Sequence, residues 1–502
     1  MAFSRRVWQV TPSNFLRSLL PSFMADAVWP KEPCHNHSCR RSPRLHSTSY
    51  LDGLRGIASV IVFICHYTEK RHDHLLPTYG HYRLPRTDSG DIALTPTSSF
   101  LQVPIFRVLY SGRPAVHVFF VISGFVLSYK PLRLLHGPEG LGACYSALAS
   151  LAFRRPIRLF LPCAVSTLAV AVLCQTGQLY AADTTWAGQL HSWAQTYAGR
   201  IAWPWAWDRD LRPGYDIHLW TIPIEFAHAM LLFVVLLALA PLRTQVRQVL
   251  TGVLAGYCLA CGRWAAFEFL AGFALAEVHV LRAATAMAGD HRSTTLSHLA
   301  AGAFHSTVLA ACLFVAGWPN EDADKTPGIR ALLSNTPAWF LSNGRDEALT
   351  EREDWGEALL EQKFWFGLAA VLLVWSCGEF AAARRQFERP LAQYCGRISY
   401  AVYLVHGPAL DYWKDMTDRL VKPIGMETAV RRMTTWLVGL LFLGSVVVWL
   451  ADLFWRQVDA PIVALGRAVE QVCLQTDRCN DTWLCLEAKK VEDRHGFTGI
   501  VD

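Results

Sequence analysis

Two side chains with different chemistry lie on one apolar stretch near the start of the sequence. Arg55 and His66 are eleven residues apart within the largely apolar segment 51–68. In a helix this spacing is about three turns, so both side chains face one side, roughly 16 Å apart along the axis. A guanidinium can bind phosphate oxygens and an imidazole can act as a general base. The alternative, equally favoured by this spacing alone, is that both side chains reach for the two membrane surfaces.

A carboxylic acid and a second histidine follow in another apolar stretch. Glu225 lies within the segment 217–240, and His228 follows three residues later. A carboxylate in an apolar span has to be neutral, paired or solvated, because an isolated charge in a low dielectric is too costly. Two interpretations stay open: Glu225 has a chemical function, or it forms a structural pair with His228 on the same side of the helix.

A polar stripe marks a late apolar run. Ser399, Tyr403 and His406 are spaced by four and three residues, so they share one face of a helix. A polar stripe on an otherwise apolar helix turns toward the centre of a bundle. We therefore expect His406 to lie near the other ionisable groups of the chain.

Further polar groups accompany two other apolar runs. Arg155 and Arg158 lead into the run 157–175. Their guanidinium groups could bind phosphate oxygens bidentately, or could anchor the helix at the membrane surface. Ser123 and Gly124 form a small notch among aromatic residues, which would let a neighbouring helix approach closely.

The composition predicts a polytopic membrane protein built of helices. The 502 residues are 52% apolar and only 18% charged, against about 25% charged in an average soluble domain. The net charge of +6 is not concentrated in a compact basic domain, which argues against nucleic-acid binding. The fourteen cysteines are scattered and lack a recognised zinc spacing, so we expect no metal.

About ten apolar runs are long enough to suggest membrane spans of roughly 20 residues, and the fold class predicted is all-α. They lie near 51–68, 115–130, 157–175, 217–240, 246–262, 264–281, 298–318, 364–379, 394–412 and 430–452. Bases in the short loops gather on one side, which predicts that both termini are cytosolic. The loop 69–113 is an exception, because it carries six bases on the opposite side.

Five of these stretches resemble the ordered motifs of acyltransferase family 3. They are Leu51-Asp52-Gly53-Leu54-Arg55-Gly56-Ile57-Ala58 followed by His66, then Phe119 to Phe125, the R-x-x-R-L-x-x-P string at Arg155–Pro162, Trp220 with Glu225, and the S-Y-x-x-Y-L-x-H string at Ser399–His406. The middle of the fourth motif departs from the family pattern, since Thr221-Ile222-Pro223-Ile224 precedes the glutamate. The resemblance extends over about 49–466, between a cytosolic N-terminal segment 1–48 and a cytosolic tail 467–502.

The resemblance implies a membrane O-acyltransferase that moves an acyl group, commonly acetyl, from coenzyme A to a hydroxyl of a small molecule. His66 would be the general base, with Glu225 or His406 orienting it or relaying the proton. Arg55, Arg155 and Arg158 would bind the coenzyme A phosphates. The supporting residues would be Trp220, Ser399, Tyr400, Tyr403 and Ser123.

The resemblance further suggests a fungal biosynthetic enzyme of the endoplasmic reticulum or another endomembrane, acting on a sterol, terpenoid, polyketide or sugar hydroxyl. Two other functions are compatible with buried Arg, His and Glu side chains. One is a proton-coupled transporter, which would show related halves that this sequence lacks. The other is a non-catalytic membrane relative. The sequence contains no indication of the oligomeric state.

Overall fold

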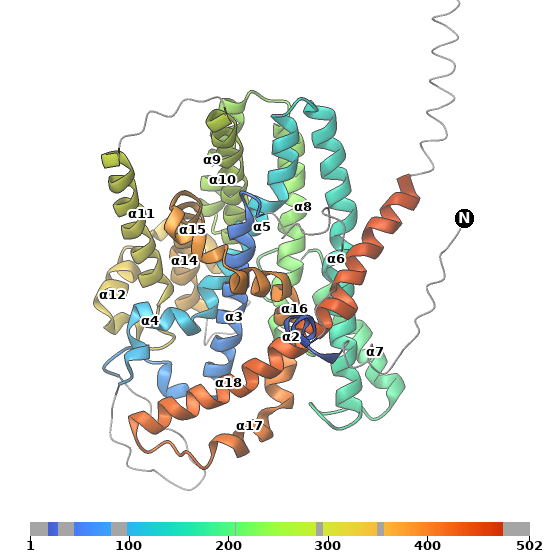
Figure 1. Ribbon diagram of the computed structural model, residues 1–502, viewed down its shortest axis with the longest axis vertical. Helices are drawn as coiled ribbons and strands as arrows, with labels where there is room; N and C mark the ends of the chain where they lie inside the picture. Colours follow the sequence, from blue (N-terminus) through green and yellow to red (C-terminus); the bar gives the residue numbers. More distant parts are fainter. Residues whose placement is uncertain are drawn as a thin grey trace, which may run out of the picture.

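The computed structural model describes residues 19–28, 45–81, 98–205, 207–287, 295–348 and 356–474. Within these ranges the chain is a bundle of helices with no β-strand (Figure 1). Its one extended feature there is an isolated bridge between Pro77 and Glu321. The predicted all-α class is confirmed.

Every apolar run expected to span the membrane lies in a helix. The ten helices concerned are α3 (Ser49–Arg71), α5 (Gly112–Leu135), α6 (Gly140–Gln175), α8 (Thr221–Leu239), α9 (Thr244–Ala260), α10 (Trp264–Met287), α11 (Thr295–Ala316), α14 (Gly356–Glu379), α16 (Pro390–Tyr412) and α18 (Ala429–Phe454). Shorter helices lie at the ends and edges of the bundle: α2 (Ser22–Val28), α4 (Pro104–Arg107), α7 (Trp186–Thr196), α12 (Pro327–Ser334), α13 (Ala338–Ala348), α15 (Ala381–Phe387) and α17 (Lys414–Val421).

The ten membrane spans expected are not confirmed. Six described helices are long and apolar enough to cross a membrane, and α14 with α15 would make a seventh if the pair, bent by 97°, is one broken span. The helix α9 has only 17 residues, and the described apolar part of α11 is a short segment, Ala300–Ala316. Apolar runs in sequence therefore identified the helices correctly, whereas they did not fix how many of them span the bilayer.

The helix α3 runs through the middle of the bundle and packs along α16 and α5 (Figure 1). Its closest seam is with α16, where Gly56 meets Gly396. A methyl group added to Gly56 would lie 2.2 Å from the backbone nitrogen of Gly396, so neither residue can carry a side chain without moving a helix. This backbone contact fixes the position of α3 relative to α16, and these two helices carry His66 and His406.

A second tight seam joins α5 to α10. A methyl group on Gly124 would lie 2.2 Å from the carbonyl oxygen of Phe269, and one on Gly272 would lie 2.2 Å from that of Val121. The close approach expected from the Ser123-Gly124 notch is confirmed. The seam places Ser123 against the centre of the bundle.

Part of the N-terminal segment belongs to the bundle. The helix α2 begins at Ser22, whose backbone N–H and hydroxyl both donate to the carboxylate of Asp452 on α18, at 3.0 and 2.6 Å. Asp452 also accepts from Arg456 at 2.7 Å, so its buried charge is compensated. The helix α18 runs obliquely across the bundle beside α2 (Figure 1).

Candidate active site

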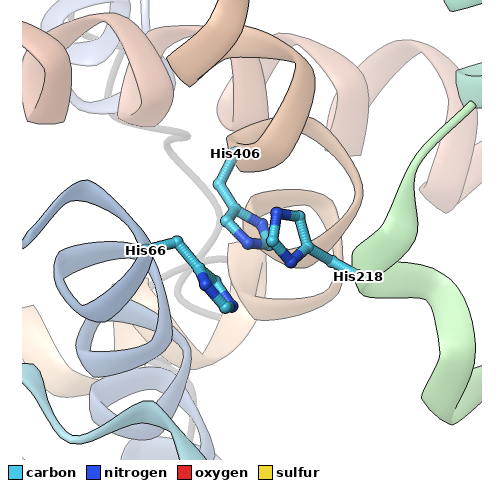
Figure 2. A group of neighbouring side chains, drawn as sticks. All are labelled: His66, His218 and His406. Carbon is cyan, nitrogen blue, oxygen red and sulfur yellow. The ribbon is translucent and has the colours of Figure 1, made fainter. Parts of the chain in front are cut away.

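Three histidines from distant parts of the chain meet at one end of α3 (Figure 2). The ring centroids of His66 and His218 are 4.0 Å apart, those of His218 and His406 are 4.7 Å apart, and those of His66 and His406 are 5.4 Å apart. One ring nitrogen of each lies within 4.8 Å of the others. We call these three residues the histidine cluster.

The hydrogen bonds of His406 define which of its nitrogens is available. Its Nδ1 contacts the carbonyl oxygens of Val402 and Tyr403 at 3.1 and 2.8 Å, and a carbonyl can only accept, so Nδ1 carries the proton. The side chain is fully buried, and Nε2 has no partner among the described residues. His406 therefore presents an unused lone pair to the cluster.

His66 is held by a carboxylate on its own helix. Its Nδ1 lies 3.2 Å from Oε2 of Glu69, three residues further along α3. The other oxygen of Glu69 accepts from the Asn320 side chain at 2.8 Å, which fixes the carboxylate from a second segment. A carboxylate on Nδ1 orients an imidazole and leaves Nε2 as the basic atom. With one quarter of its side chain exposed, His66 is the most accessible member of the cluster.

His218 enters from a short turn of 3₁₀-helix, Ile217–Trp220, just before α8. The carboxylate of Asp216 caps this turn by accepting from the backbone N–H of His218 at 3.0 Å. Burial raises the pKa of Asp216 to about 7. Opposite, Gly407 leaves room for the His218 ring, because a methyl group there would lie 2.5 Å from ring carbon Cδ2.

Of the residues expected as support, Tyr403 contacts the cluster, and the others bond or pack elsewhere in the bundle. The Tyr403 hydroxyl bonds the carbonyl of His218 and lies 2.7 Å from the hydroxyl of Thr221. Tyr400 donates to the carbonyl of Leu159 at 2.7 Å, which ties α16 to α6. Ser399 bonds within its own helix, to the carbonyl of Gly396 at 2.9 Å. Trp220 is half-buried against the apolar core.

At the other end of α3, Arg55 lies in a second polar group. It donates to Asp52 and to the carbonyl of Gly396, both at 3.2 Å, and about one third of its side chain is exposed. The charges of Arg158, Glu225 and Asp459 act on it electrostatically. We call Arg55, Arg155, Arg158 and Glu225 the arginine cluster.

The structure places Glu225 in this cluster, away from two partners that the sequence had left open. Glu225 pairs with the buried Arg155 and accepts from Ser123 at 3.1 Å. His228 has other partners, namely the carbonyl of Ile224 at 2.8 Å and Asp208 at 3.4 Å. Neither the possible Glu225–His228 pair nor the possible contact of Glu225 with His66 is formed. The reason is tertiary, since α6 brings Arg155 to the carboxylate.

Arg158 is exposed and lines a cavity of about 100 Å³ near the same end. Three more arginines line it, Arg154, Arg155 and Arg467. Arg154 is paired with Glu470 at 3.0 Å. Arg155 and Arg158, expected to act together, therefore share one basic cavity, although Arg155 is already engaged by Glu225.

A larger polar cavity of about 420 Å³ lies near the histidine end. Its lining includes Tyr180, Gln189 and Tyr215. The Tyr180 hydroxyl donates to Asp411 at 2.6 Å, and Asp411 also pairs with Lys70 at 2.6 Å, one turn after His66. This chain of contacts connects the wall of the cavity to the helix that carries His66.

Sequence reasoning missed two members of the site. His218 precedes the Trp220–Glu225 motif but belongs to none of the helical stripes, so only the fold reveals its neighbours. Glu69 could have been found, because three residues after His66 is the spacing at which side chains meet on a helix. The structure brings His66 and His406 together as expected, and places Glu225 apart from them.

Comparisons with known proteins agree with the motifs. A family model described as an acyltransferase domain matches residues 48–456. An O-acetyltransferase, PaAT-1 of Phomopsis amygdali, is 28% identical over 488 residues, covering 89% of each chain. Acyltransferase R4 of a Phoma species and acyltransferase clz18 of Cochliobolus lunatus are 28% and 27% identical, covering 73% of this chain and 85% of their own. No solved structure shows significant similarity.

Proposed function

The chain belongs to the acyltransferase 3 family, and on this basis we propose that it transfers an acyl group, acetyl by preference, from acyl-coenzyme A to a hydroxyl of a small-molecule acceptor. The observation that carries the proposal is the His66–Glu69 pair, whose imidazole faces two further histidines. The name O-acetyltransferase of one relative supports acetyl as the group transferred.

In the proposed reaction, His66 Nε2 removes the proton of the acceptor hydroxyl as its oxygen attacks the thioester carbonyl. The new C–O ester bond forms, the C–S bond breaks, and the leaving thiolate of coenzyme A takes the proton from the imidazolium. Glu69 stabilises the imidazolium that forms in between, as the carboxylate of a catalytic triad does. General-base help of this kind contributes about 10²–10⁴-fold to the rate.

The arginine cluster is proposed as the site of the coenzyme A phosphates. Arg55 and Arg158 expose guanidinium groups there, and guanidinium matches phosphate geometry. Arg55 and His66 are roughly 16 Å apart along α3, which suits an extended pantetheine arm. One helix would thus hold the donor's phosphates at one end and the reacting thioester at the other.

We further propose a role in small-molecule biosynthesis, with the protein in an endomembrane and both termini cytosolic; the three relatives named above are acyltransferases from fungi. In this orientation the arginine cluster faces the cytosol, where coenzyme A is available.

The proposal is tested by incubating membranes that contain the protein with labelled acetyl-coenzyme A and a metabolite extract of the source organism. We expect a labelled product with the wild type and about 10²–10⁴-fold less with His66→Ala. A matched control is His305→Gln, since His305 is also buried but contacts Ser376 on α14, at 3.3 Å. Near-normal product from a well-expressed His66→Ala protein would contradict the assignment.

A further inference from the structure

We propose that His66, His218 and His406 form a binding site for a divalent transition-metal ion, Zn²⁺ in particular, and that an ion bound there blocks acyl transfer. The sequence predicted no metal, because its cysteines lack a zinc spacing, and these three histidines lie far apart in the chain. The fold brings them together so that one nitrogen of each lies within 4.8 Å of the others (Figure 2).

The hydrogen bonds around the cluster are those of metal-ligating histidines. Such a histidine donates its second N–H to a carboxylate or a backbone carbonyl, which fixes the tautomer and aims the other nitrogen at the ion. Glu69 occupies Nδ1 of His66, and the carbonyls of Val402 and Tyr403 occupy Nδ1 of His406. Both rings therefore offer Nε2, and that of His406 is buried without a partner among the described residues.

The size and charge of the cluster also suit Zn²⁺. Three histidines with a fourth position open form a familiar zinc set, with Zn–N distances of about 2.0–2.1 Å. Tetrahedral geometry then places the nitrogens about 3.4 Å apart, so the rings would draw together by roughly 1.4 Å from the widest separation. The nearest cation on α3, Lys70, is paired with Asp411, and Glu69 adds a negative charge.

Inhibition follows from the atom that the ion would use. The lone pair on His66 Nε2 is the one that accepts the acceptor's proton in the proposed reaction, and it cannot bind an ion at the same time. This part of the inference rests on the proposed function. Metal binding itself does not, so the two can fail separately.

Binding is tested on the purified full chain with Co²⁺, whose visible spectrum reports tetrahedral coordination. We expect one Co²⁺ per chain, displaced by Zn²⁺. His218→Gln and His406→Gln should remove the tetrahedral spectrum, and Glu69→Gln should weaken binding about 10–100-fold. His305→Gln is the matched control and should bind normally. Elution of each variant as a monodisperse peak verifies that it is folded. Tetrahedral binding that survives in both His218→Gln and His406→Gln, or its absence in the wild type, would overturn the site.

Inhibition is tested in the labelled acetyl-transfer assay. Added Zn²⁺ should reduce wild-type transfer at least 10-fold at saturation, and excess chelator should restore it. Transfer that is unaffected by Zn²⁺ at concentrations that saturate the site would overturn the inhibitory role. Loss of transfer with chelator and recovery with Zn²⁺ would overturn it too. A wild-type rate in His66→Ala would refute the proposed base, while the Co²⁺ spectrum would still decide whether the cluster binds metal.

Discussion

The two ends of α3 hold polar groups in opposite ways. At the arginine end, opposite charges neutralise one another: Arg155 pairs with Glu225, and Arg55 bonds Asp52. At the histidine end, partners fix the rings by one nitrogen and leave the other free, as the carbonyls of Val402 and Tyr403 do for His406. The ion pairs at the arginine end stabilise buried charges. The contacts at the histidine end leave a nitrogen lone pair available on each oriented ring.

This difference separates residues that hold the protein together from residues available for chemistry. A buried ion pair that loses one partner leaves an uncompensated charge, which costs stability before it costs activity. Substituting a histidine whose reactive Nε2 makes no structural contact should remove its chemistry with little effect on packing. Substitutions at the two ends should therefore be distinguishable by whether stability or turnover changes.

The largest effect on stability is expected at the Arg155–Glu225 pair. Arg155→Met should lower the free energy of unfolding by about 3–5 kcal/mol, because Glu225 is then left without its cation. The double variant Arg155→Met/Glu225→Gln should regain most of the loss. Thermal unfolding in detergent measures both. If the single and double variants were equally unstable, the pair would not be the main contribution of Arg155.

At the histidine end, Glu69 should affect turnover instead. Glu69→Ala should lower kcat by about 100-fold with KM little changed, since it removes the group that stabilises the imidazolium. Glu69→Gln keeps a hydrogen-bond acceptor without the charge and should retain more activity than the alanine variant. Kinetics with labelled acetyl-coenzyme A measure the split. A raised KM together with a lowered melting temperature, with kcat unchanged, would indicate that Glu69 has a structural role alone.

Returning to the arginine end, Arg158→Ala should raise the KM for acetyl-coenzyme A about tenfold, equivalent to about 1.4 kcal/mol, with kcat and stability nearly unchanged. The exposed guanidinium is lost without disturbing a buried pair. Arg431→Ala is a suitable control, because Arg431 is an exposed arginine that pairs only with Glu427, four residues earlier in the chain, among the ion pairs of the described residues. An unchanged KM would remove Arg158 from the proposed phosphate site.

A dependence of stability on pH is expected from Asp216, which caps the turn that carries His218. Burial raises its pKa to about 7, above the value of about 3.9 in an unfolded chain. The folded protein thus binds the proton more tightly, and the free energy of unfolding should fall as pH rises from about 4 to about 7. Asp216→Asn keeps the cap but cannot titrate, so its melting temperature should vary less with pH than that of the wild type. A slope identical to the wild type would contradict this.

Much of the fold and part of the site could be predicted from sequence. Apolar runs located the ten long helices, and the spacing of polar residues on α16 placed His406 in the bundle interior, whereas the spacing on α3 left His66 open between the interior and the membrane surface. These are local properties of one helix. The span number could not be fixed this way, because the length of an apolar run does not show a bend such as that between α14 and α15.

The partners of each ionisable group were the harder part. The spacing of Glu225 and His228 allowed a pair within one helix, yet each has a partner from another segment, Arg155 and Asp208. Local spacing gives the contacts that a helix can make, and tertiary packing decides which are made. His218 illustrates the same limit, because its role as a neighbour of His66 depends on a turn positioned by Asp216 and Gly407.

The glycine seam between α3 and α16 has a consequence for how the protein is made. Arg55 on α3 bonds the carbonyl of Gly396, 341 residues later in the chain. During synthesis α3 emerges early, but the helix that completes its surface is among the last to leave the ribosome. The small-residue face of α3 therefore stays without its α16 contacts until most of the protein has been translated. A chain truncated before α16 loses the anchor of its first long helix as well as one histidine.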